Sequence, residues 1–491
     1  MVYGFSPIGI MGRLVRVEVD IRRGLPGTDI VGLPSSEVRE ARERVRVAIR
    51  NSGFTYPADR ILVSLSPAEI PKIGAGFDLP IALAILLRSE QVSIGEPFLA
   101  VGELSIRGEV IPVRGTLSAV LTAQEHRIRP AVVPVRAERY LRGVNLDTQD
   151  VATVAHLKQL RNGTPHPLTQ IAPTSGNGGD ALCFDDMRGQ TSLKWASAVA
   201  AAGHHNILYM GPPGSGKTMA ARRIGSFLPD LPEQAAREVA RIYSMRGIEG
   251  ACPGRRPPFR IPHHGASLEG MLGGGKGNLP GEVSLAHHGV LVLDEATEFR
   301  PQVLQALREP VEARRITISR AGRVEDFPSS FQLVLTSNLC PCGKLGQDNE
   351  TCMCSTQEIA RYWRRLGSAL LDRVDIRVRS YYSRHSSGTV DQASLNRQVG
   401  RAIERQQSRG GRYTRNGLVP PEKLEQMLPL SPGLTALLHT RMRQLGLSDR
   451  AATSVRSVAR TLADLDDRTA VEPKDILEAA GMRGAGPERL A

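Results

Sequence analysis

Alternating and clustered apolar residues divide the first 160 residues into short strands and helices. Leu14–Ile21 alternates apolar and charged side chains, which predicts a strand with one face in water. Ser35–Asn51 carries charges of both signs at helical spacing and ends before Gly53, which predicts a helix. A strand over Arg60–Leu65 and an apolar helix over Ile81–Leu87 follow. Further along, the pattern predicts a hairpin at 102–110, a helix at 116–125 and a strand at 131–134.

Later in the chain, fully apolar runs replace the alternating pattern. Ile207–Met210, Val290–Leu293 and Phe331–Leu335 are typical of parallel strands covered by helices on both faces. From about residue 390 the pattern becomes helical. Between the two halves, Arg161–Asp180 contains three prolines and four glycines, the composition of a flexible linker. We therefore expect an α/β chain with a domain at 1–160, a linker at 161–180, a parallel-sheet domain at 181–385 and a helical domain at 386–491.

A phosphate-binding loop follows the apolar run at 207–210. The sequence Gly-Pro-Pro-Gly-Ser-Gly-Lys-Thr leads into an alanine-rich helix, which gives the order strand, loop, helix that a P-loop needs. Glycines let backbone N–H groups point at phosphate oxygens, and the helix start adds partial positive charge. Lys217 is predicted to reach the β- and γ-phosphates of ATP, and the Thr218 hydroxyl to bind Mg²⁺. The predicted nucleotide-binding residues are Gly211, Pro212, Pro213, Gly214, Ser215, Gly216, Lys217 and Thr218.

Two carboxylates end the apolar run at 290–293. Because parallel strands present their carboxyl ends at one edge of the sheet, Asp294 and Glu295 should lie next to the phosphates. Asp294 is predicted to hold Mg²⁺ through water, and Glu295 to orient and deprotonate the attacking water.

The charge balance points weakly to a polyanionic partner. The chain has 63 Lys and Arg against 50 Asp and Glu, a formal charge of +13. Nucleic acid is the first candidate, although arginine-rich proteins can be basic without binding it. No apolar run approaches the length of a membrane span, and the N-terminus does not resemble a signal peptide, so we expect a cytoplasmic protein without membrane contact. A basic hairpin turning at Ala321-Gly322 supplies the candidate DNA contacts Arg314, Arg315, Arg320 and Arg323.

Four of the six cysteines cluster at Cys340, Cys342, Cys352 and Cys354. Four thiolates can close a structural zinc site, but the C-x-C spacing is tighter than usual, and reduced thiols in a loop remain the alternative. Two histidine pairs, 263–264 and 287–288, also invite a metal assignment. Adjacent histidines on loops rarely converge on one ion, so we do not expect a metal there.

Three polar residues resemble functional positions of AAA+ ATPases. Asn338 ends a buried strand as the sensor-1 residue does, and would hold the lytic water. Arg373, in Leu370-Leu371-Asp372-Arg373, resembles the arginine finger that reaches a neighbouring subunit's γ-phosphate. Arg450 matches sensor 2 in the same resemblance.

The first 160 residues resemble the proteolytic domain of Lon. In that resemblance the nucleophilic serine of Lon falls on Gly76 and its lysine base on about Leu117. Neither residue can perform or activate an acyl attack, so the domain is expected to be Lon-like in fold and inactive as a protease.

Nearly the whole chain resembles the YifB/ComM family of magnesium-chelatase-like AAA+ ATPases. The specific motifs are Gly76–Pro80, Pro262–His264 and Asn338–Cys354. The resemblance implies a hexameric, ATP- and Mg²⁺-dependent helicase on single-stranded or branched DNA, which promotes branch migration during integration of transforming DNA. Three other classes stay open. They are a chelatase-type motor that remodels a protein partner for metal insertion, an ATP-dependent Lon-like protease and an ATP-dependent scaffold that does not translocate.

Overall fold

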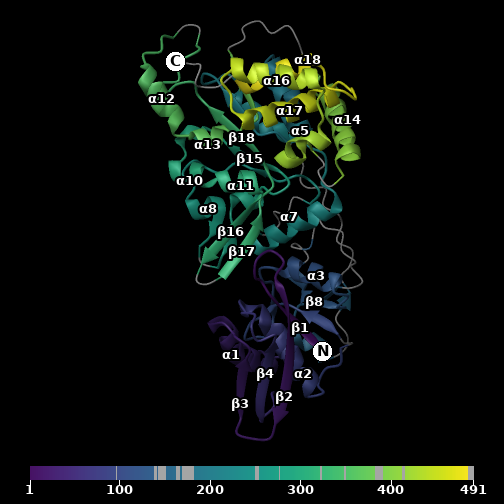
Figure 1. The fold of residues 1–491 in the computed structure, drawn as a ribbon. Helices are drawn as coiled ribbons and strands as arrows, with labels where there is room; N and C mark the ends of the chain where they lie inside the picture. Colours follow the sequence, from purple (N-terminus) through teal and green to yellow (C-terminus); the bar gives the residue numbers. More distant parts are fainter. Residues whose placement is uncertain are drawn as a thin grey trace.

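The chain builds two sheets and a group of C-terminal helices. The computed structural model describes residues 1–94, 97–137, 141, 151–161, 166–167, 182–248, 254–275, 277–320, 323–347, 350–381, 391–411 and 415–484. Most of the predicted linker at 161–180 lies outside these residues. Figure 1 shows the N-terminal sheet at one end of the molecule and the C-terminal helices at the other. Among the described residues, no helix is both long and apolar enough to cross a bilayer.

The N-terminal sheet has eight strands in the order β10-β9-β8-β5-β1-β2-β4-β3. Its predicted strands and helices are confirmed to within a few residues at each end. The strands are β1 (Val2–Ser6), β2 (Arg13–Arg22), β3 (Gly27–Val31), β4 (Arg60–Ser66), β5 (Phe98–Ala100), β8 (Ala131–Pro134), β9 (Val151–Val154) and β10 (His166–Pro167). The predicted hairpin is the antiparallel pair β6 (Glu103–Leu104) and β7 (Val110–Ile111).

Helices cover both faces of this sheet. They are α1 (Ser36–Asn51), α2 (Asp78–Arg88) and α3 (Thr116–Glu125). Successive side chains of a strand point to opposite faces. On β5, Phe98 and Ala100 pack in the core that contains α1 and α2, whereas Leu99 packs in the core that contains α3. The sheet therefore lies between two separate apolar cores.

The P-loop sheet has five parallel strands in the order β12-β15-β18-β11-β19. They are β12 (Phe259–Arg260), β15 (Val290–Leu293), β18 (Gln332–Ser337), β11 (Ile207–Met210) and β19 (Ile376–Arg379). Every residue of β11, β15 and β18 is buried. On β11, Ile207 and Tyr209 face one core while Leu208 and Met210 face the other, so both faces are covered as the apolar runs predict.

The C-terminal helices pack on one face of the P-loop sheet. They are α14 (Gln392–Gly410), α16 (Pro432–Gln444), α17 (Asp449–Leu465) and α18 (Pro473–Gly484), and they share a core with α5 (Thr191–Gly203). Asp464 is fully buried on α17 and pairs with Arg409 at 2.7 Å and Arg460 at 2.9 Å. A buried carboxylate needs such partners, and the pair with Arg409 of α14 holds that helix against α17.

Helix α7 (Glu233–Arg246) joins the two sheets. Ala240 and Met245 pack in the same apolar core as Leu117 of α3. Arg241, only 4% exposed, donates from Nη1 to the Thr122 hydroxyl at 2.9 Å and from Nη2 to Glu125 at 2.6 Å. Figure 1 shows α7 lying between α3 and the helices of the P-loop sheet. Outside α7, the Gly9 backbone N–H donates to the Glu325 carboxylate at 3.2 Å, and Ile10 shares an apolar core with Leu285 and Phe327. The N-terminal sheet is thus seated on the P-loop half through α7 and through these contacts.

Candidate nucleotide-binding site

The P-loop spans the gap between the end of β11 at Met210 and the start of α6 (Lys217–Arg223). Gly214 and Gly216 have φ angles of +74° and +90°, a region that only glycine enters at little cost. At Gly211, an added Cβ would lie 2.0 Å from the hydroxyl oxygen of Ser380, the residue after β19. A side chain at position 211 would therefore displace Ser380. The loop conformation depends on these glycines.

Lys217 lies folded inside the loop. Its Nζ donates to the carbonyl oxygens of Gly211 at 2.8 Å and Pro212 at 2.7 Å, and the residue is only 7% exposed. Burial lowers the pKa of Lys217 to about 8, against the opposing attraction of Asp294 and Glu295. The ammonium group is therefore held at the place where a phosphate would provide a stronger partner.

Thr218 and Asp294 meet across the site although they are 76 residues apart in sequence. The Thr218 hydroxyl donates to Asp294 Oδ1 at 2.9 Å. The Thr336 hydroxyl donates to the same oxygen at 2.7 Å and accepts the Glu295 backbone N–H at 2.9 Å. A hydroxyl and a carboxylate oxygen in contact form the donor set that Mg²⁺ prefers, so these residues fit the predicted ion.

Asn338 follows directly after β18 and is half-buried. Strand β18 pairs with β11 on one side and with β15 on the other. The residue after β18 therefore emerges between the P-loop and Asp294, the position that the predicted role of Asn338 requires.

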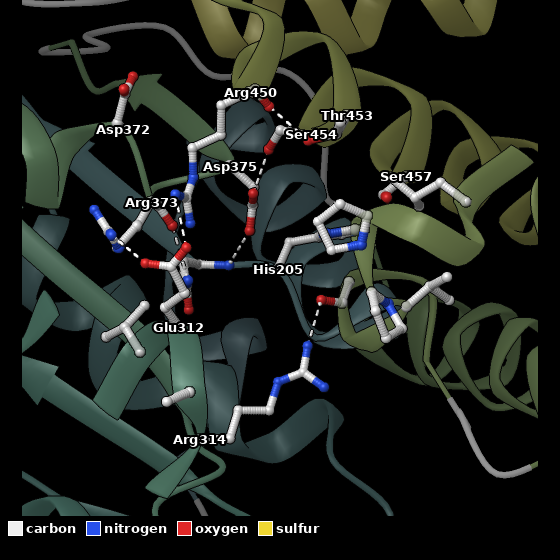
Figure 2. Close-up of a pocket in the computed structure, with 18 of the residues that line it drawn as sticks. His205, Glu312, Arg314, Asp372, Arg373, Asp375, Arg450, Thr453, Ser454 and Ser457 are labelled. Atoms are coloured by element: carbon white, nitrogen blue, oxygen red, sulfur yellow. Dashed lines mark hydrogen bonds and ion pairs between the residues drawn. The ribbon is translucent and has the colours of Figure 1, made fainter. Parts of the chain in front are cut away.

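Arg373 and Arg450 lie together in a separate pocket. Arg373 precedes β19, Arg450 is in the first turn of α17, and both pair with Glu312 of α11 (Arg308–Ala313). Figure 2 shows the three side chains converging from different elements. Among the described residues that line this pocket, none belongs to the P-loop. The prediction placed the two arginines in two distinct roles and did not anticipate their contact.

The four clustered cysteines converge in a loop beside the P-loop. Their sulfur atoms all lie within 4.8 Å of one another, and the Cys340 and Cys342 sulfurs are 3.3 Å apart. An added Cβ on Gly343 would lie 2.9 Å from Cγ of Pro213, so the cysteine loop packs directly against the P-loop. These four residues could hold one metal ion.

The histidine pairs behave differently from each other. His287 and His288 both approach Glu238 of α7, at 3.3 and 2.8 Å from Nε2 to the carboxylate, and the hydrogen bond from His287 holds the pKa of Glu238 at about 2. His287 Nδ1 accepts the Ser330 backbone N–H at 3.0 Å, so Nε2 carries the proton of the neutral ring. The ligand atoms of Glu238, His287 and His288 all lie within 4.8 Å of one another, so these three side chains converge although the sequence did not lead us to expect it. The rings of His263 and His264 lie at an angle of 33° to each other, with 4.0 Å between ring centres.

The predicted basic hairpin is present as β16 (Arg315–Arg320) and β17 (Arg323–Pro328). Arg315 is exposed, and the side chains of Arg320 and Arg323 lie outside the described part of the structure. Arg314 does not belong to the hairpin. It ends α11 and donates to the carbonyl oxygens of Leu418 at 2.8 Å and Gly417 at 3.3 Å, which turns it toward the C-terminal helices.

Three family models match successive parts of the chain. The family described as "Magnesium chelatase, subunit ChlI" matches residues 183–387, "Subunit ChlI of Mg-chelatase" matches 17–137, and "Magnesium chelatase, subunit ChlI C-terminal" matches 390–483. The "Competence protein ComM" of Haemophilus influenzae is 38% identical over 98% of this chain and 97% of that protein. The chain belongs to the YifB/ComM family of magnesium-chelatase-like AAA+ ATPases. Within that family, the "Uncharacterized protein YifB" of Escherichia coli is 37% identical over 98% of this chain and 96% of its own.

The N-terminal half of this AAA+ ATPase also resembles Lon. The "Lon protease" of Mesomycoplasma hyopneumoniae is 24% identical over 157 residues, 30% of this chain and 18% of that protein. Gly76 is buried, and an added Cβ would lie 3.1 Å from Val113 Cγ2. Leu117 is 1% exposed and packs in the core shared with α7. Both positions are therefore buried, and neither carries a side chain that could act as a nucleophile or a base.

Two residues that sequence reasoning missed complete the picture. Thr336 links Asp294 to the Glu295 backbone, and a polar residue near the end of an apolar strand was a usable signal for it. Glu312 gave no such signal, because its partners lie 61 and 138 residues away.

Proposed function

We propose that this chain is an ATP-driven ring motor, a hexamer by family resemblance, that acts on DNA in the cytoplasm. In this proposal it is a helicase that promotes branch migration while transforming DNA is integrated. The observation that carries the ATPase part is the contact between Thr218 of the P-loop and Asp294 at the end of β15.

In this proposal, each residue near that contact would have a defined task in ATP hydrolysis. Lys217 would leave its two backbone carbonyls for the β- and γ-phosphates, while the P-loop N–H groups hold the remaining oxygens. Thr218 and Asp294 would hold Mg²⁺, which offsets the charge of the triphosphate when bound. Glu295, exposed beside them, would accept a proton from the attacking water that Asn338 orients.

Support for DNA as the partner comes from two sources. The relative in Haemophilus influenzae is named for competence, and the chain carries an excess of 13 positive charges. The β16–β17 hairpin presents Arg315 to solvent and has Arg320 and Arg323 as the last pair of its ladder. Such contacts would bind phosphates without reading sequence, so binding should weaken as salt is raised.

An ATPase assay with and without DNA tests the proposal. We expect single-stranded or branched DNA to raise the rate of phosphate release. ATP-dependent strand displacement on forked and four-way substrates should follow, and it should be lost in Glu295→Gln. A rate that does not change with any DNA would argue against a helicase. It would leave the chelatase-type motor or the scaffold as the better description.

A protease remains as the alternative that the Lon resemblance raises. Gly76 and Leu117 oppose it, because neither can act as nucleophile or base. Casein cleavage by the purified chain that persists in Lys217→Ala would show that the Lon-like domain is an active peptidase.

We also propose that Cys340, Cys342, Cys352 and Cys354 bind structural Zn²⁺. A tetrahedral ion with Zn–S bonds of about 2.3 Å places its sulfurs about 3.8 Å apart. The distances of 3.6 Å from Cys352 to Cys340 and to Cys342 are close to that value. Metal analysis of the purified chain should give about one zinc per subunit, and Cys342→Ser with Cys352→Ser should abolish it. A chain that folds with no bound zinc would leave these residues as reduced thiols.

A further inference from the structure

A single carboxylate, that of Glu312, lies between Arg373 and Arg450 in the pocket away from the P-loop. Its Oε2 accepts from Nη2 of Arg373, and its Oε1 accepts from Nη1 of Arg450 at 3.0 Å. The three residues come from α11, from the segment before β19 and from the first turn of α17. Figure 2 shows Glu312 placed between the two guanidinium groups, with dashed lines to both.

Arg373 depends on this carboxylate more than Arg450 does. The Arg373 side chain is 15% exposed, whereas the Arg450 side chain is 42% exposed. Arg373 Nη1 is held from the other side by the Ala369 carbonyl oxygen at 2.6 Å. Its Nε is buried and has no hydrogen-bond partner among the described residues. A cation this far from water needs a nearby anion, and Glu312 is the one in contact.

Without the carboxylate, the two arginines would repel each other. Both guanidinium groups contact the same carboxylate, and like charges that lie so close disfavour each other even near the surface. The same contacts lower the pKa of Glu312, with the hydrogen bond from Arg373 as the largest cause. Glu312 is therefore charged at neutral pH and neutralises one of the two positive charges.

The arginine pair borders a cavity rather than its own P-loop. The cavity has a volume of about 560 Å³ and lies between the P-loop half and the C-terminal helices. Besides Glu312 and the two arginines, it is lined by residues of both parts, including His205, Asp375 and Ser454. The arginines have room beside them for a group that comes from outside the subunit.

We propose that Glu312 is a positioning residue that holds Arg373 and Arg450 as one unit, so that both act on the same triphosphate of a neighbouring subunit. The proposal rests on the proposed function, a ring of subunits, and on the resemblance of Arg373 to an arginine finger that reaches a neighbouring subunit's γ-phosphate. Because the two side chains share one carboxylate, an incoming phosphate that meets one of them meets the other as well. Glu312 contacts neither the nucleotide nor the attacking water in this scheme and acts only through the arginines.

Glu312→Gln tests the proposal with little change in shape. The amide keeps the size of the side chain and removes its charge, so the arginines lose their common anchor. Misplacing a catalytic group by about 1 Å can cost about 100-fold in rate, and we expect kcat for ATP to fall by about 10- to 100-fold. The KM for ATP should stay within about threefold, because the P-loop is untouched. Glu312→Asp, which keeps the charge, should recover part of the lost kcat.

Glu233→Gln is the matched control. Glu233 lies on α7, its side chain is 53% exposed against 52% for Glu312, and it pairs with one arginine, Arg237, at 2.7 Å. This variant should keep kcat within about twofold, since exposed ion pairs contribute little.

A combination of variants separates positioning from a purely structural role. In an Arg373→Ala/Arg450→Ala background, adding Glu312→Gln should lower kcat by less than about twofold, because the groups it positions are already gone. A full additional loss there, or a wild-type kcat in Glu312→Gln alone, would overturn the proposal. If Glu312→Gln does not fold, Glu312→Ala replaces it, because it also removes the carboxylate, and an unchanged kcat in that variant overturns the proposal equally.

The failure of the proposed function would look different. If Arg373→Ala hydrolyses ATP at the wild-type rate, the shared site between subunits is wrong whatever Glu312 does. If Arg373→Ala loses activity while Glu312→Gln keeps it, only the role of Glu312 is wrong.

Discussion

The two halves of this protein share one local feature but differ in what surrounds it. Each has a glycine-containing turn beside a buried helix start: Gly211–Gly216 before α6 in one, and Gly74–Gly76 before α2 in the other. At the P-loop, polar groups of Lys217 and Thr218 remain available to a ligand. In the Lon-like half, Val113 closes on Gly76, and Leu117 is covered by α7. The side chains packed against such a turn therefore determine whether a ligand can reach it.

The largest expected effect comes from removing the proposed general base of the P-loop half. Glu295→Gln should lower kcat for ATP about 10²–10⁴-fold, because a general base contributes that much, and should leave nucleotide binding in place. Phosphate release and ADP titration measure the two properties. Glu298→Gln, three residues further along and also exposed, should stay within about twofold. Equal rates for the wild type and Glu295→Gln would mean that Glu295 is not the base.

An attempt to restore the missing Lon residues sharpens the comparison from the other side. Gly76→Ser with Leu117→Lys should produce no casein cleavage, because the lysine would lie under α7 without a partner. Burying that charge should cost about 3 kcal/mol. The melting temperature should then fall by about 6–12 °C, as measured by differential scanning fluorimetry.

Leu25→Lys provides the control, since Leu25 is 86% exposed and its replacement should leave the melting temperature unchanged. A stable double variant that cleaves casein would show that the Lon-like site is open after all.

The smallest expected effect is the uptake of protons when ATP binds. With the pKa of Lys217 at about 8, half of the nucleotide-free molecules carry a neutral lysine at pH 8. Phosphates favour the charged form and raise its pKa, so ATP binding at pH 8 should take up about half a proton. Above pH 8 the affinity should fall by up to about tenfold per pH unit.

Titration calorimetry in two buffers of different ionisation enthalpy measures the proton uptake. Lys217→Arg should abolish it if that variant binds ATP, because a guanidinium does not titrate there. No uptake in the wild type at pH 8 would contradict the lowered pKa.

Local sequence was enough for those parts of the site that strand ends and short loops create. The contact between Thr218 and Asp294 follows from two apolar strands that end at one edge of a parallel sheet. The convergence of the four cysteines could be anticipated because they lie within fifteen residues of one another.

The remainder depends on how distant elements pack. Glu312 acquires its partners from α17 and from the segment before β19, and no periodicity in α11 indicates either of them. Arg314 adjoins the basic hairpin in sequence, yet its left-handed backbone, with φ of +56°, directs it to the C-terminal helices.

The seat of α3 on α7 has a practical consequence for anyone who wants the motor alone. A shortened chain that began at residue 182 would keep the P-loop and all its partners, but it would uncover Ala240, Met245 and the guanidinium of Arg241. An apolar patch of that kind, once exposed to water, promotes self-association. Such a fragment should precipitate or aggregate where the full chain stays dispersed, which light scattering can show. The Lon-like half would then be kept for the surface it covers.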